Sequence, residues 1–369
     1  MVTGLNWLRG IAAILVLLSH ARPFFFVNYP DLAVPAGPIG KAFYLMSGLG
    51  VSAVMIFFVL SGYLVAGSAH RAMSSGSWSW RVYLVTRLTR LWVVLLPCLA
   101  LTLLCDLLGR HIFGSSFYEG VLVDIYFSGP SGNADLSFGA FLGNLLFLQT
   151  IVVPTYGSNG PLWSISYEFW YYMLFPALML MLWSGKSAGL RASILGAAVL
   201  LAILVGPKVM LLFPIWLMGF GAWYLRDCRL SKLLAQNCAI SVVAVVFLVG
   251  ILLFARASGL HYSLAMRYLL GLATALAIPA LHHPIFTRGS RLADGLSAGS
   301  YSLYLSHFPV LALLAAATGN HRSQTLMAGM PVFLAGLVLA ALVAAAVYKM
   351  FEQHTPILKN ALLPQLKRG

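Results

Sequence analysis

The sequence predicts an all-α protein, a polytopic membrane helical bundle of about ten transmembrane helices. Sixty per cent of its 369 residues are hydrophobic and only 9% are charged, whereas about a quarter of the residues in a soluble domain are charged. The mean hydropathy is +0.89, and successive apolar segments are each long enough to cross a hydrocarbon core of about 30 Å. These observations exclude an ordinary soluble enzyme and predict a single integral-membrane domain over residues 1–369.

Charge and cysteine content narrow the class further. The net charge of +14 arises from few acids, nine, against 23 bases. In a membrane protein, an excess of bases is typical of cytoplasmic loops and of contact with anionic lipid headgroups. We therefore expect membrane lipids as partners and no nucleic acid. The four cysteines include no CxxC pair, so we expect neither a disulfide framework nor a metal site.

The expected spans follow from apolar runs of roughly 17–25 residues. They lie near residues 5–27, 45–67, 82–108, 162–183, 190–206, 208–225, 239–256, 264–281, 299–317 and 327–350. A tight turn at Gly206-Pro207-Lys208 separates the fifth span from the sixth. The long connector 109–161 contains a segment, 138–153, that could form a re-entrant or interfacial helix, and residues 351–369 form a short tail.

The distribution of basic residues predicts the orientation. With an even number of spans, one side of the membrane collects 16 of the 23 lysines and arginines. Cytoplasmic loops carry the excess of such residues. We therefore expect both termini and the tail in the cytoplasm, and the connector 109–161 outside.

Arg9 and His20 are the most informative pair of residues in the first span. They lie eleven positions apart, which places both on one helix face and roughly 16 Å apart along the axis. If Arg9 marks one membrane surface, His20 lies past the midplane. An ionisable group at that depth is costly and by default indicates a functional site.

The second span contains the small pair Ser61-Gly62, between Phe57-Phe58 and Tyr63. Small residues let another helix or a ligand approach the backbone closely. A packing seam between helices explains this motif equally well when it is taken alone.

Arg87 and Arg90 lie three residues apart where the third span leaves the cytoplasm. Their guanidinium groups share a helix face and suit phosphate oxygens. The alternative is a positive anchor that contacts lipid headgroups, and this alternative is favoured when the motif is taken alone.

A fourth helix begins near Pro161, and Asn159 is expected to cap it. Ser164, Glu168 and Tyr172 share one of its faces, and Trp163 opens an aromatic cluster. An aromatic belt at the membrane surface does not need an embedded glutamate. Glu168 lies about 12 Å below the outer end of its helix, close to the expected depth of His20. The two could be partners or could have separate structural roles.

The ninth span carries Ser300, Tyr301, Tyr304 and His307, of which Ser300, Tyr304 and His307 lie on one face. Hydrogen bonds between helices would be an ordinary role for such residues. Glu352, just after the last span, could pair with a basic loop or simply mark a helix end.

Taken together and in this order, these residues resemble the acyltransferase-3 family of membrane O-acyltransferases. The matching pieces are Arg9-Gly10 with His20, Phe57-Phe58 with Ser61-Gly62, Arg87 with Arg90, Trp163-Ser164 with Glu168 and Tyr172, Ser300-Tyr301 with Tyr304 and His307, and Glu352 with Pro356. The chain departs from the family after Arg90, where the proline is delayed to Pro97. Some members of the family carry an appended extracytoplasmic domain. Only the short tail 351–369 follows the last span here, so we do not expect such a domain.

The resemblance implies transfer of an acyl group, typically acetyl, from cytoplasmic acetyl-CoA or another acyl-CoA to a hydroxyl of an envelope or secreted glycan or a lipid-linked saccharide. His20 would be the general base or a covalent acyl carrier, both of which suit imidazole chemistry. Arg9 would bind the donor or stabilise an oxyanion, and Glu168 would orient or charge-stabilise His20. The further implied contacts are Arg87, Arg90, Ser61 and Tyr63 toward the donor, and Trp163, Ser164, Tyr172, Tyr301, Tyr304 and His307 lining the site.

Two other functions use the same residues. A transporter or flippase of an envelope precursor would need buried polar groups along its path, but it need not bind coenzyme A or turn over a thioester. A non-catalytic assembly protein would use these groups only for packing, so His20→Ala would lower the protein level rather than the activity per molecule.

Overall fold

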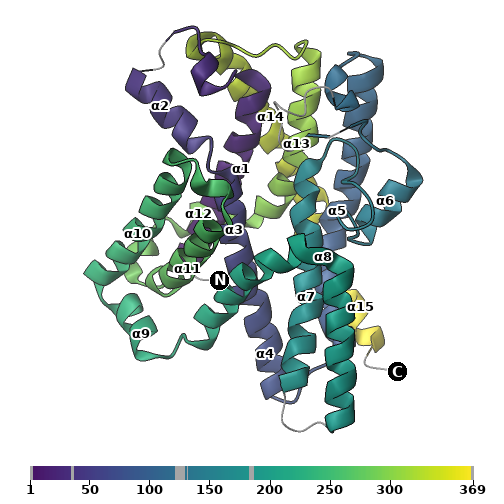
Figure 1. The fold of residues 1–369 in the computed structure, drawn as a ribbon, viewed down its shortest axis with the longest axis vertical. Coiled ribbons are helices and arrows are strands. Elements are labelled where there is room, and N and C mark those ends of the chain that lie inside the picture. The colour runs from purple at the N-terminus through teal and green to yellow at the C-terminus, as the bar shows by residue number, and fades with distance from the viewer. Residues whose placement is uncertain (1–2, 35–36, 121–128, 131, 183–186, 367–369) are drawn as a thin grey trace. The chain divides into compact units, whose positions relative to one another are not determined.

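The computed structural model describes residues 3–34, 37–120, 129–130, 132–182 and 187–366. Within these ranges the chain forms helices and no β-strand, which confirms the all-α prediction (Figure 1). The α-helices are α1 Thr3–Phe25, α2 Gly37–Met46, α3 Gly50–Ser61, α4 Gly67–Ser74, α5 Trp80–His111, α6 Phe138–Leu145, α7 Trp163–Leu182, α8 Ala188–Tyr224, α9 Arg229–Gln236, α10 Cys238–Ala257, α11 Leu264–Ala280, α12 Ser290–Ala298, α13 Ser300–Ala317, α14 Leu326–Met350 and α15 Thr355–Leu366. Short turns of 3₁₀-helix connect several of them, and η2, Gly62–Ala66, is π-helical.

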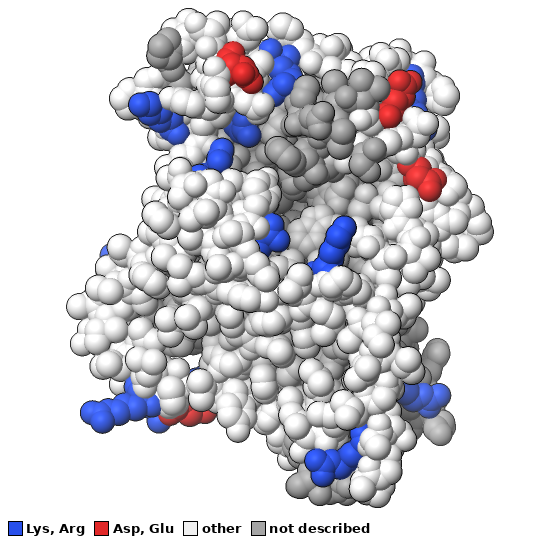
Figure 2. Space-filling model, in the orientation of Figure 1, with Lys and Arg blue, Asp and Glu red and all other residues white. Residues whose placement is uncertain are grey.

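Eight helical stretches of the described chain are long and apolar enough to cross a membrane. The long helix α8 is broken at Gly206, whose φ of 78° interrupts the helix where the sequence predicts a turn between two spans. A further apolar helix, α11, is shorter than the eight. The helical membrane bundle is confirmed, whereas the count of ten stays a prediction. Much of the surface seen in Figure 2 carries uncharged side chains, as contact with lipid requires.

The connector and the tail both contain helix. In the connector, the turn η3, Ser116–Glu119, precedes the eight-residue helix α6, which occupies part of the segment expected to be re-entrant or interfacial. In the tail, η7, Glu352–His354, links α14 to α15. The predicted end of the last span near residue 350 agrees with the end of α14.

The chain forms two compact units, each built from three stretches of sequence. Unit 1 contains Met1–Asn6, Val54–Arg87 and Ser164–Ser290. Unit 2 contains Trp7–Ala53, Leu88–Trp163 and Arg291–Gly369. The boundaries fall inside helices α1, α3 and α5 and at the starts of α7 and α12.

Each unit has an aromatic core. In unit 2 the phenylalanines that end α1, among them Phe24 and Phe25, join Phe308 of α13 and Phe333 of α14 in one buried cluster. In unit 1 the fully buried Trp216 of α8 packs against aromatic rings of α7. These two cores hold the helices that carry the polar residues described next.

Candidate functional site

His20 and His307 form a hydrogen-bonded pair in unit 2. His20 Nδ1 of α1 lies 2.8 Å from His307 Nε2 of α13. The two rings are nearly parallel, with an interplanar angle of 14° and centroids 5.1 Å apart. The ring of Phe308 meets His20 edge-on at 5.3 Å. The polar face predicted for α13 therefore meets the polar face predicted for α1.

The second nitrogen of His307 sets the direction of this bond. His307 Nδ1 lies 2.8 Å from the carbonyl oxygen of Leu303, and a carbonyl only accepts, so Nδ1 carries a proton. With both rings neutral, His307 Nε2 is the acceptor and His20 Nδ1 is the donor. His20 then has its basic lone pair on Nε2. His307 is buried, while His20 is half-buried.

Arg9 lies on the same helix as His20, as predicted, and is half-buried. The adjacent Gly10 permits close packing against α12, since a Cβ there would lie 2.6 Å from Leu296 Cβ. On α13, Tyr304 donates from its hydroxyl to the Pro161 carbonyl at 3.3 Å, and its ring lies 6.1 Å from that of His307.

Glu168 is the centre of a hydrogen-bonded cluster in unit 1. Its Oε1 accepts bonds from the Ser61 hydroxyl at 2.7 Å and from the Tyr172 hydroxyl at 2.5 Å. The indole of Trp216 donates to Ser61 Oγ at 3.1 Å. Ser61, Glu168 and Tyr172 thus contact one another, while the separate roles expected for them stay predictions. Trp216 was not predicted, because nothing in its own segment of sequence marks it as polar.

Glycines explain why this cluster can form. A Cβ at Gly62 would lie 1.9 Å from the Trp216 carbonyl oxygen, and one at Gly219 would lie 1.9 Å from the Val59 carbonyl oxygen. Both helices therefore need glycine where they cross. The close approach expected at Ser61-Gly62 is made by helix α8, and it delivers Trp216 to Ser61.

Arg87 lies beside the Glu168 cluster in unit 1. Its guanidinium donates to Ser68 Oγ at 2.8 Å. It also lies over the rings of Tyr83 and Tyr172, at 5.4 and 5.9 Å from their centroids. Such cation–π contacts hold the guanidinium in place without neutralising its charge.

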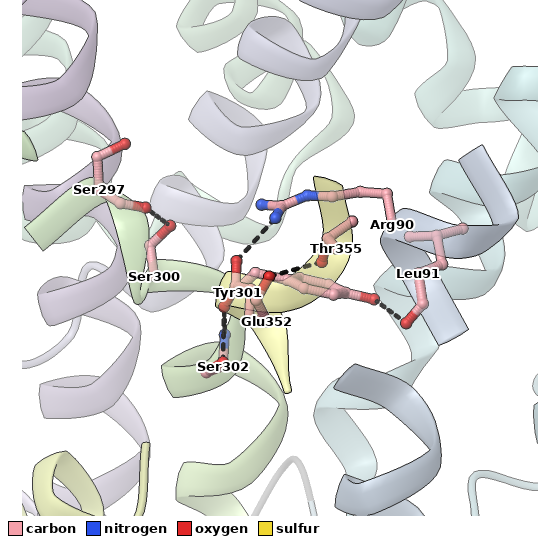
Figure 3. Close-up of polar contacts among 8 residues, drawn as sticks. All are labelled: Arg90, Leu91, Ser297, Ser300, Tyr301, Ser302, Glu352 and Thr355. Atoms are coloured by element: carbon pink, nitrogen blue, oxygen red, sulfur yellow. Dashed lines mark hydrogen bonds and ion pairs between the residues drawn. The ribbon is translucent and has the colours of Figure 1, made fainter. Parts of the chain in front are cut away.

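Arg90 has a different environment, in unit 2. It forms an ion pair with Glu352, with Nη1 2.8 Å from Oε1. Figure 3 shows Glu352 between Arg90 and Ser302, whose backbone N–H and hydroxyl donate to Oε2 at 3.0 and 2.6 Å. Arg90 also lies 5.3 Å over the ring of Tyr301, whose hydroxyl donates to the Leu91 carbonyl. Glu352 therefore follows the end of α14 and pairs with a basic residue, which belongs to helix α5 and not to a loop.

Arg87 and Arg90 thus have different contacts. A spacing of three residues leaves side chains about 60° apart around the helix axis, so each reaches a different neighbour. Their shared role as phosphate ligands stays a prediction. His20 belongs to unit 2 and Glu168 to unit 1, and their pairing also stays a prediction.

The remaining predicted residues are placed as follows. Trp163 begins α7, and Ser164, the next residue, is buried. Tyr63 lies in η2, with its ring 6.4 Å from that of His282. The cap expected at Asn159 is wrong. Asn159 precedes the helix, but its side-chain amide instead donates to Thr102 Oγ1 at 3.1 Å and to the Leu305 carbonyl at 2.9 Å. Thr102 and Leu305 are buried, as Asn159 is. Both lie far from Asn159 in the sequence, so local sequence does not predict these hydrogen bonds.

Sequence reasoning missed one buried carboxylate. Asp106 of α5 is fully buried and accepts bonds from the backbone N–H and the hydroxyl of Ser158, both at 2.6 Å. The signal was present, since Asp106 is an acid inside a predicted span. The bonds from Ser158 connect the end of the connector to α5. Gly157 also lies close to the Asp106 carboxylate. Among the residues that the structure describes, no group of three or more His, Cys, Asp or Glu could hold a metal ion.

Comparisons with known proteins give a consistent result. Residues 2–349 match a family described as an acyltransferase domain, acyltransferase-3. An O-acetyl transferase of Shigella phage Sf6 is 24% identical over 312 residues, 82% of each chain. Acyltransferase MdmB of Streptomyces mycarofaciens is 29% identical over 186 residues, which are 47% of this chain and 38% of that protein. No solved structure matches.

Proposed function

The chain belongs to the acyltransferase-3 family, and on this premise we propose that it transfers an acetyl group from cytoplasmic acetyl-CoA to a hydroxyl of an envelope glycan or a related hydroxylated acceptor. The class of membrane O-acyltransferase agrees with the family match, with the O-acetyl transferase relative and with the membrane-spanning helices. The donor, the acceptor, the bacterial cytoplasmic membrane and the cytoplasmic termini are parts of the proposal.

The observation that carries the chemistry is the His20–His307 hydrogen bond. In the proposed reaction His20 Nε2 takes the proton of the acceptor hydroxyl while the hydroxyl oxygen attacks the thioester carbonyl carbon. The new C–O bond forms, the C–S bond breaks, and coenzyme A leaves as a thiolate that takes the proton from His20. The products are an ester and free coenzyme A. His307 keeps the His20 ring in the orientation and tautomer that this step needs.

Two other polar groups have proposed roles in the same reaction. Arg9, on the helix that carries His20 but roughly 16 Å from it along the axis, binds the acyl donor, one of the two roles that the resemblance implies. Glu168, held by Ser61 and Tyr172, takes part through its charge, as the family resemblance implies. The role of Glu168 is tested separately from the role of His20.

The test is thioester turnover by the purified protein. Wild type should release free coenzyme A thiol from acetyl-CoA when an envelope fraction is supplied, and mass spectrometry should find acetylated glycan. A transporter would move an envelope precursor across a vesicle membrane without thioester turnover. That result, or glycans of equal acetylation with and without this protein, would overturn the proposal.

A further inference from the structure

A polar cleft of about 240 Å³ opens in unit 1, away from the residues assigned so far except Tyr63. It lies where the end of α8 and the short helix α9 meet η2 and the end of α11. Its lining includes Tyr63, Arg226, Asp227, Lys232 and His282. Neither the reaction step nor the Glu168 cluster uses this cleft.

The cleft is positively charged and partly preorganised. Arg226 lies 4.1 Å over the ring of Trp223, and Arg71 lies 5.3 Å over the same ring. Arg226 also donates to the Trp223 carbonyl at 3.1 Å. Arg226 and Lys232 are the two cations in the lining, against one carboxylate, Asp227, among the described lining residues. The Arg226–Asp227 contact is 3.4 Å and exposed on both sides, so water screens it strongly.

Aromatic rings flank the same cleft. The rings of Tyr63 and His282 lie 6.4 Å apart with an interplanar angle of 59°. Aromatic faces of this kind stack on nucleobases, and guanidinium and ammonium groups bind phosphates. One cleft therefore offers the two contacts that a nucleotide needs. Lipid headgroups share the phosphate chemistry but have no base to stack.

The location suits a cytoplasmic ligand. Arg71, Arg226 and Lys232 all belong to the set of bases that the charge distribution places in the cytoplasm, and the structure brings Arg71 and Arg226 onto one tryptophan. In contrast, Arg90 is already paired with Glu352. A phosphate at Arg90 would have to replace that carboxylate.

We propose that this cleft binds the phosphate-bearing nucleotide end of the acyl-CoA donor, which rests on the proposed function. Arg226 and Lys232 contact phosphate oxygens, and Tyr63 and His282 contact the adenine. The cleft, of about 240 Å³, holds the adenine ring, and the phosphates lie against the exposed side chains of Arg226 and Lys232 at its edge. The acyl arm of the donor lies outside the cleft.

The experiment measures binding without turnover. Adenosine 3′,5′-bisphosphate is titrated calorimetrically into the purified full-length protein in an uncharged detergent. Arg226→Ala and Lys232→Ala should each weaken binding about 10- to 100-fold, the range for one charge-assisted contact. Arg229→Ala is the matched control, because Arg229 is an exposed base of α9 that is absent from the cleft lining. It should change affinity less than about twofold. Lys232 is also exposed, so its variant should fold even if Arg226→Ala does not.

The outcomes separate this inference from the proposed function. If acetyl-CoA turnover and its KM are unchanged in Arg226→Ala and Lys232→Ala, the cleft assignment is wrong and the enzyme activity stands. If no turnover occurs but the bisphosphate binds as expected, the cleft assignment stands and the reaction fails. If phosphatidylglycerol in nanodiscs binds through Arg226 and Lys232 while the bisphosphate does not bind in detergent, the cleft is a lipid headgroup site and the inference is overturned.

Discussion

The 2.8 Å bond from His20 Nδ1 to His307 Nε2 joins residues 287 positions apart in the chain. Because His307 Nδ1 is committed to the Leu303 carbonyl, the protons of a neutral pair can be arranged in only one way. The result is a half-buried imidazole whose Nε2 carries the lone pair. This ordering explains how one histidine can be the reactive group and the other its support.

Replacing His20 tests the reactive role. His20→Ala and His20→Gln should abolish acyl transfer, because neither side chain can take a proton near neutral pH. Expression and thermal stability in detergent should stay near wild type, since His20 is half-buried. Turnover is measured as thiol release from acetyl-CoA. A purified variant that kept more than about a tenth of wild-type turnover would rule out both the base and the acyl-carrier role.

Replacing His307 tests the positioning role. In His307→Gln an amide oxygen can still accept from His20 Nδ1, whereas His307→Leu offers no acceptor. We expect His307→Leu to lower kcat about 10- to 100-fold, as loss of a residue that orients a functional histidine does, and His307→Gln to recover part of it. The pH profile of kcat should shift in the leucine variant. If both variants lose activity only in proportion to folded protein, His307 is merely structural.

The Arg90–Glu352 pair predicts a loss of stability. Glu352 has a side-chain exposure of 2%, so Arg90→Ala would leave a buried carboxylate without its cation. Breaking a buried pair costs about 3–5 kcal/mol, and the 35% exposure of Arg90 lowers our expectation to roughly 2 kcal/mol. Arg90→Ala combined with Glu352→Gln should recover much of the loss in thermal unfolding. Equal stability of wild type and Arg90→Ala would contradict the importance of this pair.

Coenzyme A titration separates this structural role from the donor role predicted for Arg90. If Arg90 binds a phosphate, Arg90→Ala should weaken coenzyme A binding and Arg90→Lys should recover it only partly, because a point charge cannot replace a guanidinium fork. If Arg90 serves Glu352 or lipid instead, affinity should be the same in all three proteins. Arg87→Ala is the comparison, since Arg87 has no carboxylate partner among its contacts described above and contacts Ser68.

The sequence predicts what local periodicity and hydropathy determine. The helical class and the small pair at Ser61-Gly62 follow from residue type and spacing, and the structure has both. Which helix faces meet is a different matter. His20 finds His307, and Arg90 finds Glu352 across 262 residues, through packing that no local pattern encodes. The same packing takes the Asn159 side chain away from its expected cap.

Glu168 can be tested with little change in geometry. In Glu168→Gln the amide oxygen can still accept from Ser61 and Tyr172, so the cluster should persist while its charge is lost. If Glu168 acts through its charge, kcat should fall by about two orders of magnitude, within the range typical of acid–base assistance, with little change in thermal stability. Tyr172→Phe is the control that keeps the charge and removes one hydrogen bond. Wild-type kcat in Glu168→Gln would show that Glu168 is structural.

The predicted membrane topology bears on both the proposed reaction and the proposed nucleotide cleft. A reporter fused after Gly369 should be found in the cytoplasm, and one inserted at the exposed Gly132 of the connector should be found outside. The reason is that 16 of the 23 basic residues then lie on the cytoplasmic side. A third reporter in the α9 region, near Arg229, should be cytoplasmic, as a nucleotide-binding cleft there requires. If Gly132 and Gly369 report the same side, the span count is wrong and the equal depth inferred for His20 and Glu168 fails. If the α9 reporter alone lies outside, acetyl-CoA cannot reach Arg226 and Lys232, and the cleft assignment fails while the His20 chemistry survives.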